Sequence, residues 1–288
     1  MDSLTGLQIE AINSDAKPFL KWAGGKQKLL DEYDKYFPTH FNHYFEPFVG
    51  GGAVFFHLWN IGKFSKEVFL FDSNKELINT YRVVRDKIEE LITAISVHKK
   101  KHNKDYYYKI RSLDRKNIYL NNVERAARTI YLNKTCYNGL YRVNSKGQFN
   151  VPMGSYKNPS ILYEEVLRTA SKALQIAHIE CMDFREIVDY TKEDDFIYFD
   201  PPYKPVSKTS SFTSYTSDKF NDKDQKALAY IFNELTRKKC LCMLSNSYSP
   251  LILELYKDFR IEIVRTNRSI NSNPDGRGDI KEVVVLNY

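Results

Sequence analysis

Residues 43–72 read HYFEPFVGGGAVFFHLWNIGKFSKEVFLFD, and this stretch decides the fold. An apolar strand at residues 43–46 runs into a triple glycine at residues 50–52, and an apolar helix follows. A second strand, residues 67–71, ends at Asp72. Consecutive strands joined by a helix lie parallel in one sheet, because the helix carries the chain back to the edge from which it started. The stretch therefore predicts an α/β protein.

The glycine turn and Asp72 together predict a nucleoside site. Glycine has no Cβ, so the backbone at Gly50 and Gly52 can pass close beneath a ligand. Asp72 follows Gly52 by 20 residues, at the end of the next strand, where an acid can accept both ribose hydroxyls. The turn lacks the spaced glycines that wrap a pyrophosphate on a helix N-terminus. An adenosine cofactor without a pyrophosphate fits better, and S-adenosylmethionine is the obvious one.

The α/β pattern continues on both sides of a helical middle. Further strands are predicted at residues 176–181, 195–199, 240–244, 260–264 and 282–286, and helices at residues 27–37, 54–60, 124–132 and 223–237. Apolar residues between positions 74 and 133 recur at three- and four-residue steps, which is typical of helices. Residues 133–158 are rich in Asn, Gly, Tyr and Pro, which favours loops and a hairpin. The simplest architecture is a mostly parallel sheet interrupted by a helical insertion.

The insertion carries most of the positive charge. The whole chain of 288 residues has a net charge of +7, whereas residues 74–160 contain 18 Lys and Arg against 7 Asp and Glu. No acidic residue occurs from Arg125 to Tyr163. A solvated surface usually carries both signs, so this stretch favours a phosphate-rich partner. The alternative is a basic surface without a partner.

Composition favours a protein of the reducing cytoplasm. The content of 42% hydrophobic and 27% charged residues is typical of globular proteins, and no run of 18 apolar residues predicts a membrane span. Residues 1–17 lack the apolar core of a signal peptide. The four cysteines have neither zinc nor redox spacing, so we expect buried thiols. His98 and His102 lie among lysines that would repel a cation, so we expect a solvated basic face and no metal site.

A second informative motif is Asp200-Pro201-Pro202-Tyr203, which follows the apolar strand at residues 195–199. Neither proline can donate a hydrogen bond to a sheet ladder, so the chain must leave the sheet at Asp200. A carboxylate, the proline carbonyls and an aromatic ring then lie at the carboxyl edge of the sheet, where α/β proteins bind ligands. This set suits a planar substrate with an exocyclic amino group. The alternative is a strand-ending turn without a function.

These motifs resemble those of N6-adenine DNA methyltransferases. Residues 45–52, then a long insertion and then residues 200–203 follow the alpha-type order, in which the cofactor motif precedes the catalytic motif. Three more segments narrow the resemblance to Dam-type enzymes that methylate adenine in GATC, including relatives in restriction–modification systems. These segments are KWAGGK at residues 21–26, YNGLYR at residues 137–142 and FNVP at residues 149–152. The resemblance covers nearly the whole chain.

The resemblance implies a fold, a cofactor and a partner. It implies a Rossmann-like S-adenosylmethionine-dependent methyltransferase sheet, with a catalytic domain formed by residues 1–73 and 161–288. Residues 74–160 would form a mostly helical DNA-recognition domain. The expected partner is double-stranded DNA in the bacterial cytoplasm or nucleoid. A monomeric state and a functional pairing with a GATC restriction endonuclease are further expectations.

The resemblance also assigns residues to the cofactor. They are Trp22, Lys26, Glu46, Pro47, Phe48, Gly50, Gly52, Asp72, Asp183, Phe184 and Asp200. Asp72 would bind the ribose. Asp183 would accept a hydrogen bond from the amino group of the cofactor's adenine, with Phe184 packing beside the ring. The alternative role for Asp183 is that of a helix N-cap.

Catalysis is assigned to Asp200, Pro201, Pro202 and Tyr203. Asp200 would accept one hydrogen of the target N6 amino group and the Pro201 carbonyl the other, which pulls electron density toward a nitrogen whose lone pair is delocalised into the ring. Tyr203 would stack on the adenine once it is flipped out of the duplex. A sulfonium methyl group is already activated, so direct transfer needs positioning and no covalent nucleophile.

DNA contacts are assigned to Lys21, Tyr137, Asn138, Leu140 and Arg142. The fork of the Arg142 guanidinium matches O6 and N7 of guanine. Tyr137 and Asn138 would enter the gap left by the flipped base, and Leu140 would make an apolar base contact. Lys21 would reach a base of the site from outside the insertion.

Three further segments carry expectations of their own. Residues 212–216 resemble a loop that closes over the substrate, Ser245-Asn246 would support the pocket from a strand end, and residues 273–278 look like a flexible loop. Two other functions stay open at this point. One is an RNA adenine methyltransferase, and the other is a catalytically silent DNA-binding protein on the same scaffold. A dehydrogenase with this glycine-rich turn is a more distant alternative.

Overall fold

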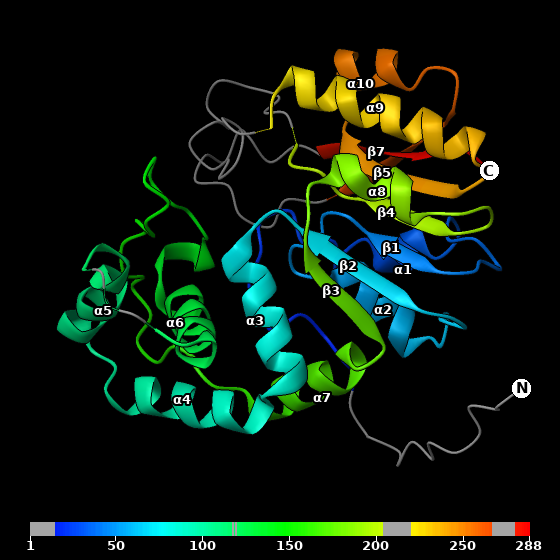
Figure 1. Cartoon of the computed structure of the whole chain (residues 1–288). Coiled ribbons are helices and arrows are strands. Elements are labelled where there is room, and N and C mark those ends of the chain that lie inside the picture. Colours follow the sequence, from blue (N-terminus) through cyan, green and yellow to red (C-terminus); the bar gives the residue numbers. More distant parts are fainter. Residues whose placement is uncertain (1–14, 117, 119, 204–219, 267–279) are drawn as a thin grey trace, which may run out of the picture.

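The computed structural model describes residues 15–116, 118, 120–203, 220–266 and 280–288, and these ranges contain a seven-stranded sheet (Figure 1). Its strands are β1 (Tyr44–Glu46), β2 (Val68–Asp72), β3 (Ala177–Cys181), β4 (Phe196–Phe199), β5 (Leu241–Ser247), β6 (Arg260–Thr266) and β7 (Ile280–Leu286). The spatial order is β3-β2-β1-β4-β5-β7-β6. Strand β7 runs antiparallel to both neighbours, and the other pairs are parallel. The predicted α/β fold with a mostly parallel, Rossmann-like sheet is confirmed.

Ten α-helices accompany the sheet in the described ranges. They are α1 (Leu30–Tyr33), α2 (Ala53–Asn60), α3 (Lys75–Asp86), α4 (Ile88–Lys100), α5 (Lys104–Arg111), α6 (Asn122–Thr135), α7 (Glu164–Leu174), α8 (Ile187–Tyr190), α9 (Asp222–Arg237) and α10 (Pro250–Leu255). Short 3-10 helices lie at Ser112–Arg115, Tyr137–Gly139 and Phe184–Glu186. No helix among the residues described is long and apolar enough to cross a membrane.

Five helices differ from the sequence-based prediction. Helix α1 has only four residues, with turns on both sides of it at residues 27–29 and 34–36. Helix α6 is longer than predicted and begins at a capping box formed by Asn121 and Glu124. Helices α7, α8 and α10 were not predicted, although buried residues of α7 such as Leu167, Ala170 and Leu174 recur with helical spacing.

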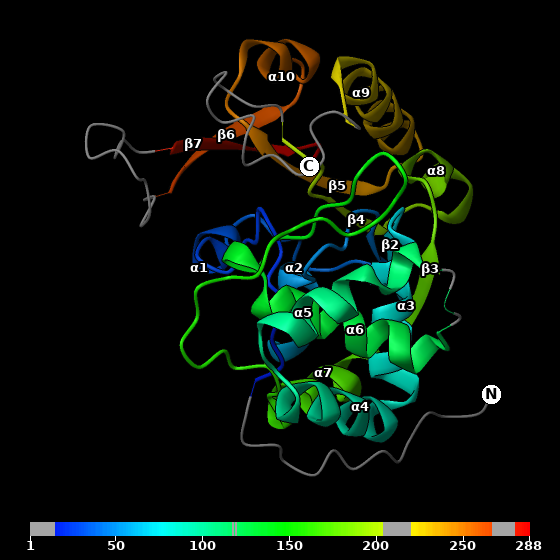
Figure 2. The ribbon, with the colours of Figure 1, turned by 90° about the vertical axis from the view of Figure 1, so that its left-hand side faces the viewer.

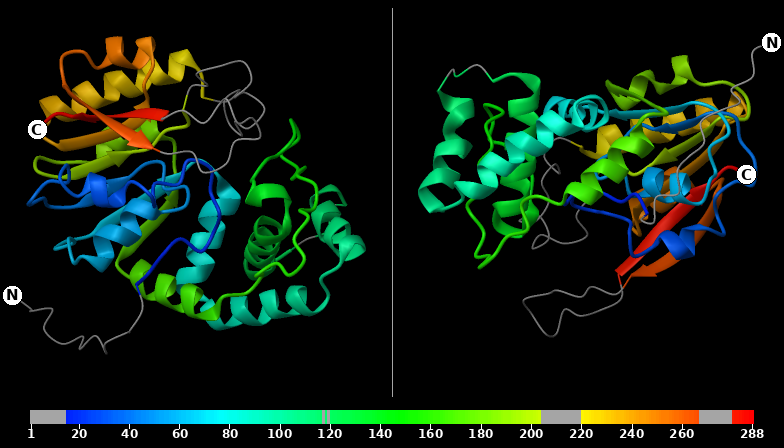
Figure 3. Two further views of the ribbon diagram at one scale, coloured as in Figure 1. Left: turned by 180° about the vertical axis from the view of Figure 1, so that it is seen from behind. Right: turned by 90° about the horizontal axis from the view of Figure 1, so that it is seen from below.

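Apolar cores lie on both faces of the sheet. Alternate residues of the inner strands enter opposite cores, as Tyr198 and Phe199 of β4 do, whereas His178 and Glu180 of the edge strand β3 are exposed. Helices α8, α9 and α10 cover one face, and α2, α3 and α7 cover the other (Figure 2). The core beneath α2, α3 and α7 continues without a break into α4, α5 and α6, which lie to one side of the sheet (Figure 3). The insertion therefore shares a core with the sheet, and α3 packs against both.

Two expectations about single side chains were wrong. His98 and His102 do not form a solvated face: their Nδ1 atoms lie 2.8 Å and 2.9 Å from the hydroxyls of Tyr106 and Tyr131. Burial lowers the pKa of His98 to about 4, so it packs as a neutral ring. Among the described residues no His, Cys, Asp or Glu cluster could hold a metal. Cys181 is exposed because it ends the edge strand β3, whereas the other three thiols are buried as expected.

Asn133 on α6 joins the insertion to the N-terminal segment. Its side chain is 1% exposed. The amide donates to the carbonyls of Lys21 (2.8 Å) and Gly139 (2.9 Å), and its oxygen accepts from the Lys21 N–H (2.8 Å). One buried side chain thus holds two segments that lie more than a hundred residues apart in the sequence.

We expect Asn133→Ala to lower the free energy of unfolding by about 1–3 kcal/mol, because it leaves buried backbone groups without partners. Denaturant titration measures this change. Asn233→Ala on α9 is the control, since the Asn233 amide bonds only to a carbonyl of its own helix, that of Ala229. Equal losses in the two variants would contradict a special role for Asn133.

Candidate active site

The glycine turn lies at the carboxyl ends of β1 and β2 and is held by Asp72. Gly50 and Gly52 have φ angles of 47° and 69°, in the left-handed region that favours glycine. The Asp72 carboxylate accepts hydrogen bonds from the backbone N–H of Gly50 (3.2 Å) and of Asn74 (2.9 Å). Burial raises the pKa of Asp72 to about 6, although these two hydrogen bonds oppose the shift. The carboxyl group is therefore fixed beside the turn, at the position predicted for a ribose contact.

Tyr81 on α3 supports the same turn, and sequence reasoning had placed it only in the helical core. Its buried hydroxyl donates to the Gly50 carbonyl at 3.0 Å. A Cβ on Gly52 would lie 2.7 Å from this hydroxyl, so no larger residue fits there without a shift. The helical spacing of Tyr81 indicates burial, but nothing in the sequence shows that its hydroxyl reaches the turn.

Trp22 packs against the bare backbone of the turn. A Cβ on Gly50 would lie 2.8 Å from Cδ1 of the indole. The indole also stacks on Tyr141 of the insertion, with ring centroids 5.4 Å apart and planes inclined by 27°. An aromatic wall, a backbone without side chains and an acid at the next strand end together fit an adenosine group. These residues can therefore hold the predicted cofactor.

The residues between β1 and the turn differ in their availability to a ligand. Glu46 is 2% exposed and accepts a hydrogen bond from the Tyr44 hydroxyl at 2.9 Å. Burial raises the pKa of Glu46 well above its usual range, so it is held as a buried acid. Pro47 is also buried, whereas Phe48 is half-buried and packs on Phe184 with ring centroids 5.2 Å apart. Of the three assigned residues, Phe48 offers the most surface to a ligand.

Asp183 caps the short helix Phe184–Glu186. Its carboxylate accepts from the Arg185 N–H at 2.9 Å, and the Glu186 carboxylate accepts from the Asp183 N–H at 3.1 Å. The Arg185 guanidinium also lies 3.0 Å from both Asp183 oxygens. The structure thus contains the N-cap that the sequence left as an alternative. Contact of Asp183 and Phe184 with an adenine stays a prediction.

Asp200 lies directly after β4 and pairs with Lys26. The Lys26 ammonium is 2.8 Å from Oδ1 of Asp200, and the lysine side chain is only 3% exposed. The Ser245 hydroxyl of β5 donates to the same oxygen at 3.0 Å. Within the described ranges, hydrogen bonds to this carboxylate reach Oδ1 alone, so Oδ2 is the oxygen that can accept from a ligand. Lys26, which the resemblance assigns to the cofactor, thus contacts the catalytic motif itself.

The backbone of the motif is held by a buried amide pair. Gln225 on α9 donates from Nε2 to the Pro202 carbonyl at 3.2 Å. Asn246 on β5 donates in turn to Gln225 Oε1 at 3.1 Å. Both amides are almost fully buried. Ser245 and Asn246 therefore support the motif, as the sequence suggested, while Gln225 was missed although it is a polar residue on the apolar face of its helix.

The Tyr203 side chain is contacted at its hydroxyl and over one face of its ring. Its hydroxyl donates to Oε2 of Glu282 on β7 at 2.8 Å. The Lys26 ammonium lies 4.7 Å from the centre of its ring. Glu282 was not singled out from the sequence, since nothing in its strand indicates a contact with residue 203.

The predicted DNA contacts gather at one end of the insertion. Tyr137 is 53% exposed, and Asn138 is exposed with a φ angle of 54°. Lys21 lies against Gly139, where a Cβ would be 2.3 Å from the lysine Cδ. Leu140 is half-buried against the core. The structure thus brings Lys21 together with the loop, although they are distant in sequence.

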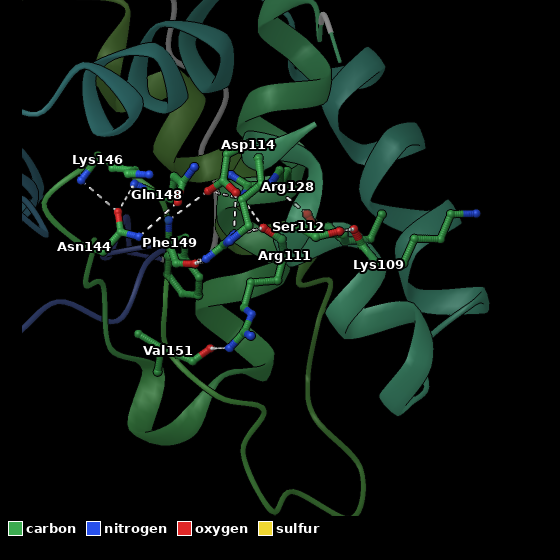
Figure 4. Close-up of polar contacts among 12 residues, drawn as sticks. Lys109, Arg111, Ser112, Asp114, Arg128, Asn144, Lys146, Gln148, Phe149 and Val151 are labelled. Carbon is green, nitrogen blue, oxygen red and sulfur yellow. Dashed lines mark hydrogen bonds and ion pairs between the residues drawn. The ribbon is translucent and has the colours of Figure 1, made fainter. Parts of the chain in front are cut away.

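Arg142 directly precedes Val143, which forms a bridge with Phe149 in a hairpin. Figure 4 shows Asp114 and Arg128 beside Phe149 of this hairpin. The Arg142 Nε donates to Asn150 Oδ1 at 2.7 Å, and the arginine side chain is exposed. Asp114 accepts from the Phe149 N–H and from Arg128, both at 2.8 Å. Because the hairpin backbone is anchored in this way, the Arg142 guanidinium has a defined position.

Two predicted segments, residues 212–216 and 273–278, lie outside the described residues. The other assigned site residues fall into two groups. One gathers around the glycine turn and Asp200, and the other around residues 137–142. Residues 21–26 contact both groups.

Comparison with known proteins agrees with this geometry. A family model described as D12 class N6 adenine-specific DNA methyltransferase matches residues 22–270. A type II methyltransferase of Lactococcus lactis subsp. cremoris is 45% identical over 286 residues, which cover 98% of each chain. Another, of Methanocaldococcus jannaschii, is 45% identical over 289 residues, covering 95% of this chain and 100% of its own. A DNA adenine methylase of Haemophilus influenzae is 36% identical over 274 residues, covering 94% of this chain and 93% of its own.

The raised pKa of Asp72 predicts that affinity for S-adenosylmethionine depends on pH. In the predicted contact, the ionised carboxylate would accept hydrogen bonds from the ribose hydroxyls, so its protonation would weaken binding. With a pKa of about 6 instead of 3.8, Asp72 is mostly ionised at pH 7 and mostly protonated at pH 5. We expect the dissociation constant measured by calorimetry to rise about tenfold between these pH values. Asp72→Asn should bind weakly at both, and a wild-type slope retained in this variant would assign the titration to another group.

Proposed function

The chain belongs to the D12 class of N6 adenine-specific DNA methyltransferases, and from this premise we propose that it methylates adenine within GATC sites of duplex DNA. Enzymes of this class take the methyl group from S-adenosylmethionine. The observation that carries the proposal is the Asp200 carboxylate, which is tied through one oxygen to Lys26 and Ser245 beside the glycine turn. The recognition site itself is proposed from the YNGLYR and FNVP segments and from the adenine methylase relatives.

In the proposed reaction, Asp200 orients the target amino group. Its Oδ1 is held by Lys26 and Ser245, so Oδ2 accepts one N6 hydrogen while the Pro201 carbonyl accepts the other. Two acceptors draw electron density toward a nitrogen lone pair that is otherwise delocalised into the ring. When bound, S-adenosylmethionine supplies an activated methyl group, so direct transfer needs no covalent nucleophile. Pro202 and Tyr203 complete the motif, and the ring of Tyr203 stacks on a base flipped out of the duplex.

We propose that residues 74–160 recognise the DNA and that residues 1–73 and 161–288 form the catalytic domain. The basic charge of the insertion supports contact with phosphates. Within it, Arg142 reads a guanine edge, Tyr137 and Asn138 fill the gap of the flipped base, and Leu140 contacts a base. Lys21 reaches the site from the N-terminal segment, and its position beside Gly139 supports this role.

The biological setting is also a proposal. Two relatives are named type II methyltransferases, which supports a pairing with a restriction endonuclease that cuts the same site. We further propose that the enzyme is a monomer acting in the bacterial cytoplasm or nucleoid.

Transfer of labelled methyl from S-adenosylmethionine tests the proposed substrate. The substrates are a GATC duplex, the same duplex with one base pair of the site changed, and a structured RNA. We expect label in adenine of the GATC duplex alone. Label in both duplexes would reject the site, and label in the RNA alone would reject DNA as the substrate.

Asp200→Asn should slow methyl transfer by about 10²–10³-fold. The amide oxygen can still accept from Lys26 and Ser245, but the NH₂ at the other position is a donor and opposes the target amino group. Binding of DNA and of S-adenosylmethionine, measured separately, should change little. Unchanged turnover would remove Asp200 from the mechanism.

Arg142→Ala should relax discrimination at one base pair of the site by about 1–3 kcal/mol, because a bidentate guanine contact is lost. The ratio of kcat/KM for sites that differ at that pair measures the effect. Arg142→Lys keeps the charge and is the matched control, since it should keep the salt dependence of binding and still lose discrimination. Uniform weakening on every sequence would make Arg142 a phosphate contact.

A further inference from the structure

We propose that Glu282 is a positioning residue that orients the Tyr203 ring for the target base. The inference rests on the proposed function, in which that ring stacks on the adenine. Glu282 lies outside residues 22–270, the segment that the family model matches. It also lies far from Tyr203 in the sequence, so only the folded chain brings the two together.

Glu282 reaches the catalytic motif from across the sheet. It is a half-buried residue of β7, paired in register with Ser247 of β5 and Val264 of β6. Tyr203 follows β4, which is separated from β7 by β5. The hydroxyl-to-carboxylate distance of 2.8 Å therefore requires the tyrosine side chain to extend past the carboxyl end of β5. A charged acceptor makes this a strong hydrogen bond.

The hydroxyl contact completes a set of three constraints on the ring. At the backbone end, Gln225 holds the carbonyl of the preceding residue, Pro202. At the far end, Glu282 holds the hydroxyl. The Lys26 ammonium lies over one face, 4.7 Å from the ring centre. In the proposed function the base would stack on the opposite face, and the tilt of that face depends on the Glu282 contact.

The charges around Glu282 fit this role. Burial raises the pKa of Glu282, and Asp200 adds to the shift, whereas Lys26 and the Tyr203 hydroxyl oppose it. Lys26 thus pairs with the carboxylate that would hold the substrate and also favours the ionised form of the one that holds the stacking ring. After Glu282, β7 continues with the buried residues Val283 to Leu286, so the acid lies next to the apolar part of the strand.

Four variants distinguish a role of Glu282 in orienting the Tyr203 ring from an effect of its charge and from an effect on folding. Glu282→Ala removes the acceptor, and Tyr203→Phe removes the donor. Glu282→Gln keeps an oxygen that can accept the hydroxyl hydrogen. The double variant Tyr203→Phe with Glu282→Ala removes both partners. Glu262→Ala on the adjacent strand β6 is the matched control, because Glu262 pairs with Arg260 and not with the motif.

Single-turnover methylation of the DNA site used by the wild type is the first measurement. We expect Glu282→Ala and Tyr203→Phe each to lower the rate about tenfold through lost orientation, with the affinity for S-adenosylmethionine unchanged. The double variant should be no slower than either single variant, because one interaction is removed in all three. Glu282→Gln should stay within about twofold of wild type, and Glu262→Ala should not differ from it.

Base stacking gives a readout that needs no methyl transfer. In DNA with 2-aminopurine at the target adenine, stacking on Tyr203 quenches the fluorescence of the flipped base. We expect brighter complexes with Glu282→Ala and Tyr203→Phe than with wild type, and wild-type fluorescence with Glu282→Gln and Glu262→Ala.

The outcomes distinguish the inference from the proposed function. A wild type that methylates no adenine in duplex DNA overturns the function, and the inference with it. If the wild type methylates adenine in duplex DNA, and the Glu282→Ala variant shows the same methylation rate and the same 2-aminopurine fluorescence as wild type, only the inference is overturned. Additive losses in the double variant would also overturn it, because Glu282 would then act independently of Tyr203. If Glu282→Ala fails to fold, Tyr203→Phe decides by the same two measurements, since it leaves Glu282 in place.

Discussion

The ion pair between Lys26 and Asp200 is the interaction on which the rest of the site depends. A lysine with 3% of its side chain exposed requires a partner, because breaking a buried pair costs about 3–5 kcal/mol. The pair draws residues 21–26 across the carboxyl ends of the central strands. Trp22 is thereby placed on the glycine turn and Lys21 against Gly139.

The proposed catalytic residues and the proposed DNA-contacting residues lie on parts of the protein that share one packed core. The core on one face of the sheet continues into α4, α5 and α6, so packed side chains set the position of the insertion. Asn133 binds the backbone of Lys21 and of Gly139, and Trp22 stacks on Tyr141. These contacts give residues 137–142 a fixed relation to the glycine turn. A recognition loop on a flexible linker would lack this relation.

Sequence-based predictions were correct where a short motif restricts its own backbone. They were incomplete where a side chain is contacted by residues that are distant in the sequence. The glycine turn, Asp72 and the double proline each constrain the backbone directly, and the strands around them lie where predicted. Tyr81, Gln225 and Glu282 support the site through single side-chain atoms that reach it from α3, α9 and β7. Helical or strand periodicity reports that such residues are buried or half-buried, but it does not report which atom they contact. His98 of α4 and His102, which follows the C-cap of that helix, were misread for the same reason, since their tyrosine partners lie on α5 and α6.

By itself, the sequence determined the α/β class, the turn that approaches a nucleoside, the exit of the chain at Asp200 and the family. The turn and the chain exit follow from adjacent residues whose backbone restrictions act locally, and the family follows from the order of such short motifs along the chain. The tertiary structure alone decided that Lys26 joins Asp200, that only one oxygen of that carboxylate is engaged within the described residues, and that Glu282 holds Tyr203. These contacts join residues at least 45 positions apart, and their existence depends on strand order and burial, which no local pattern encodes.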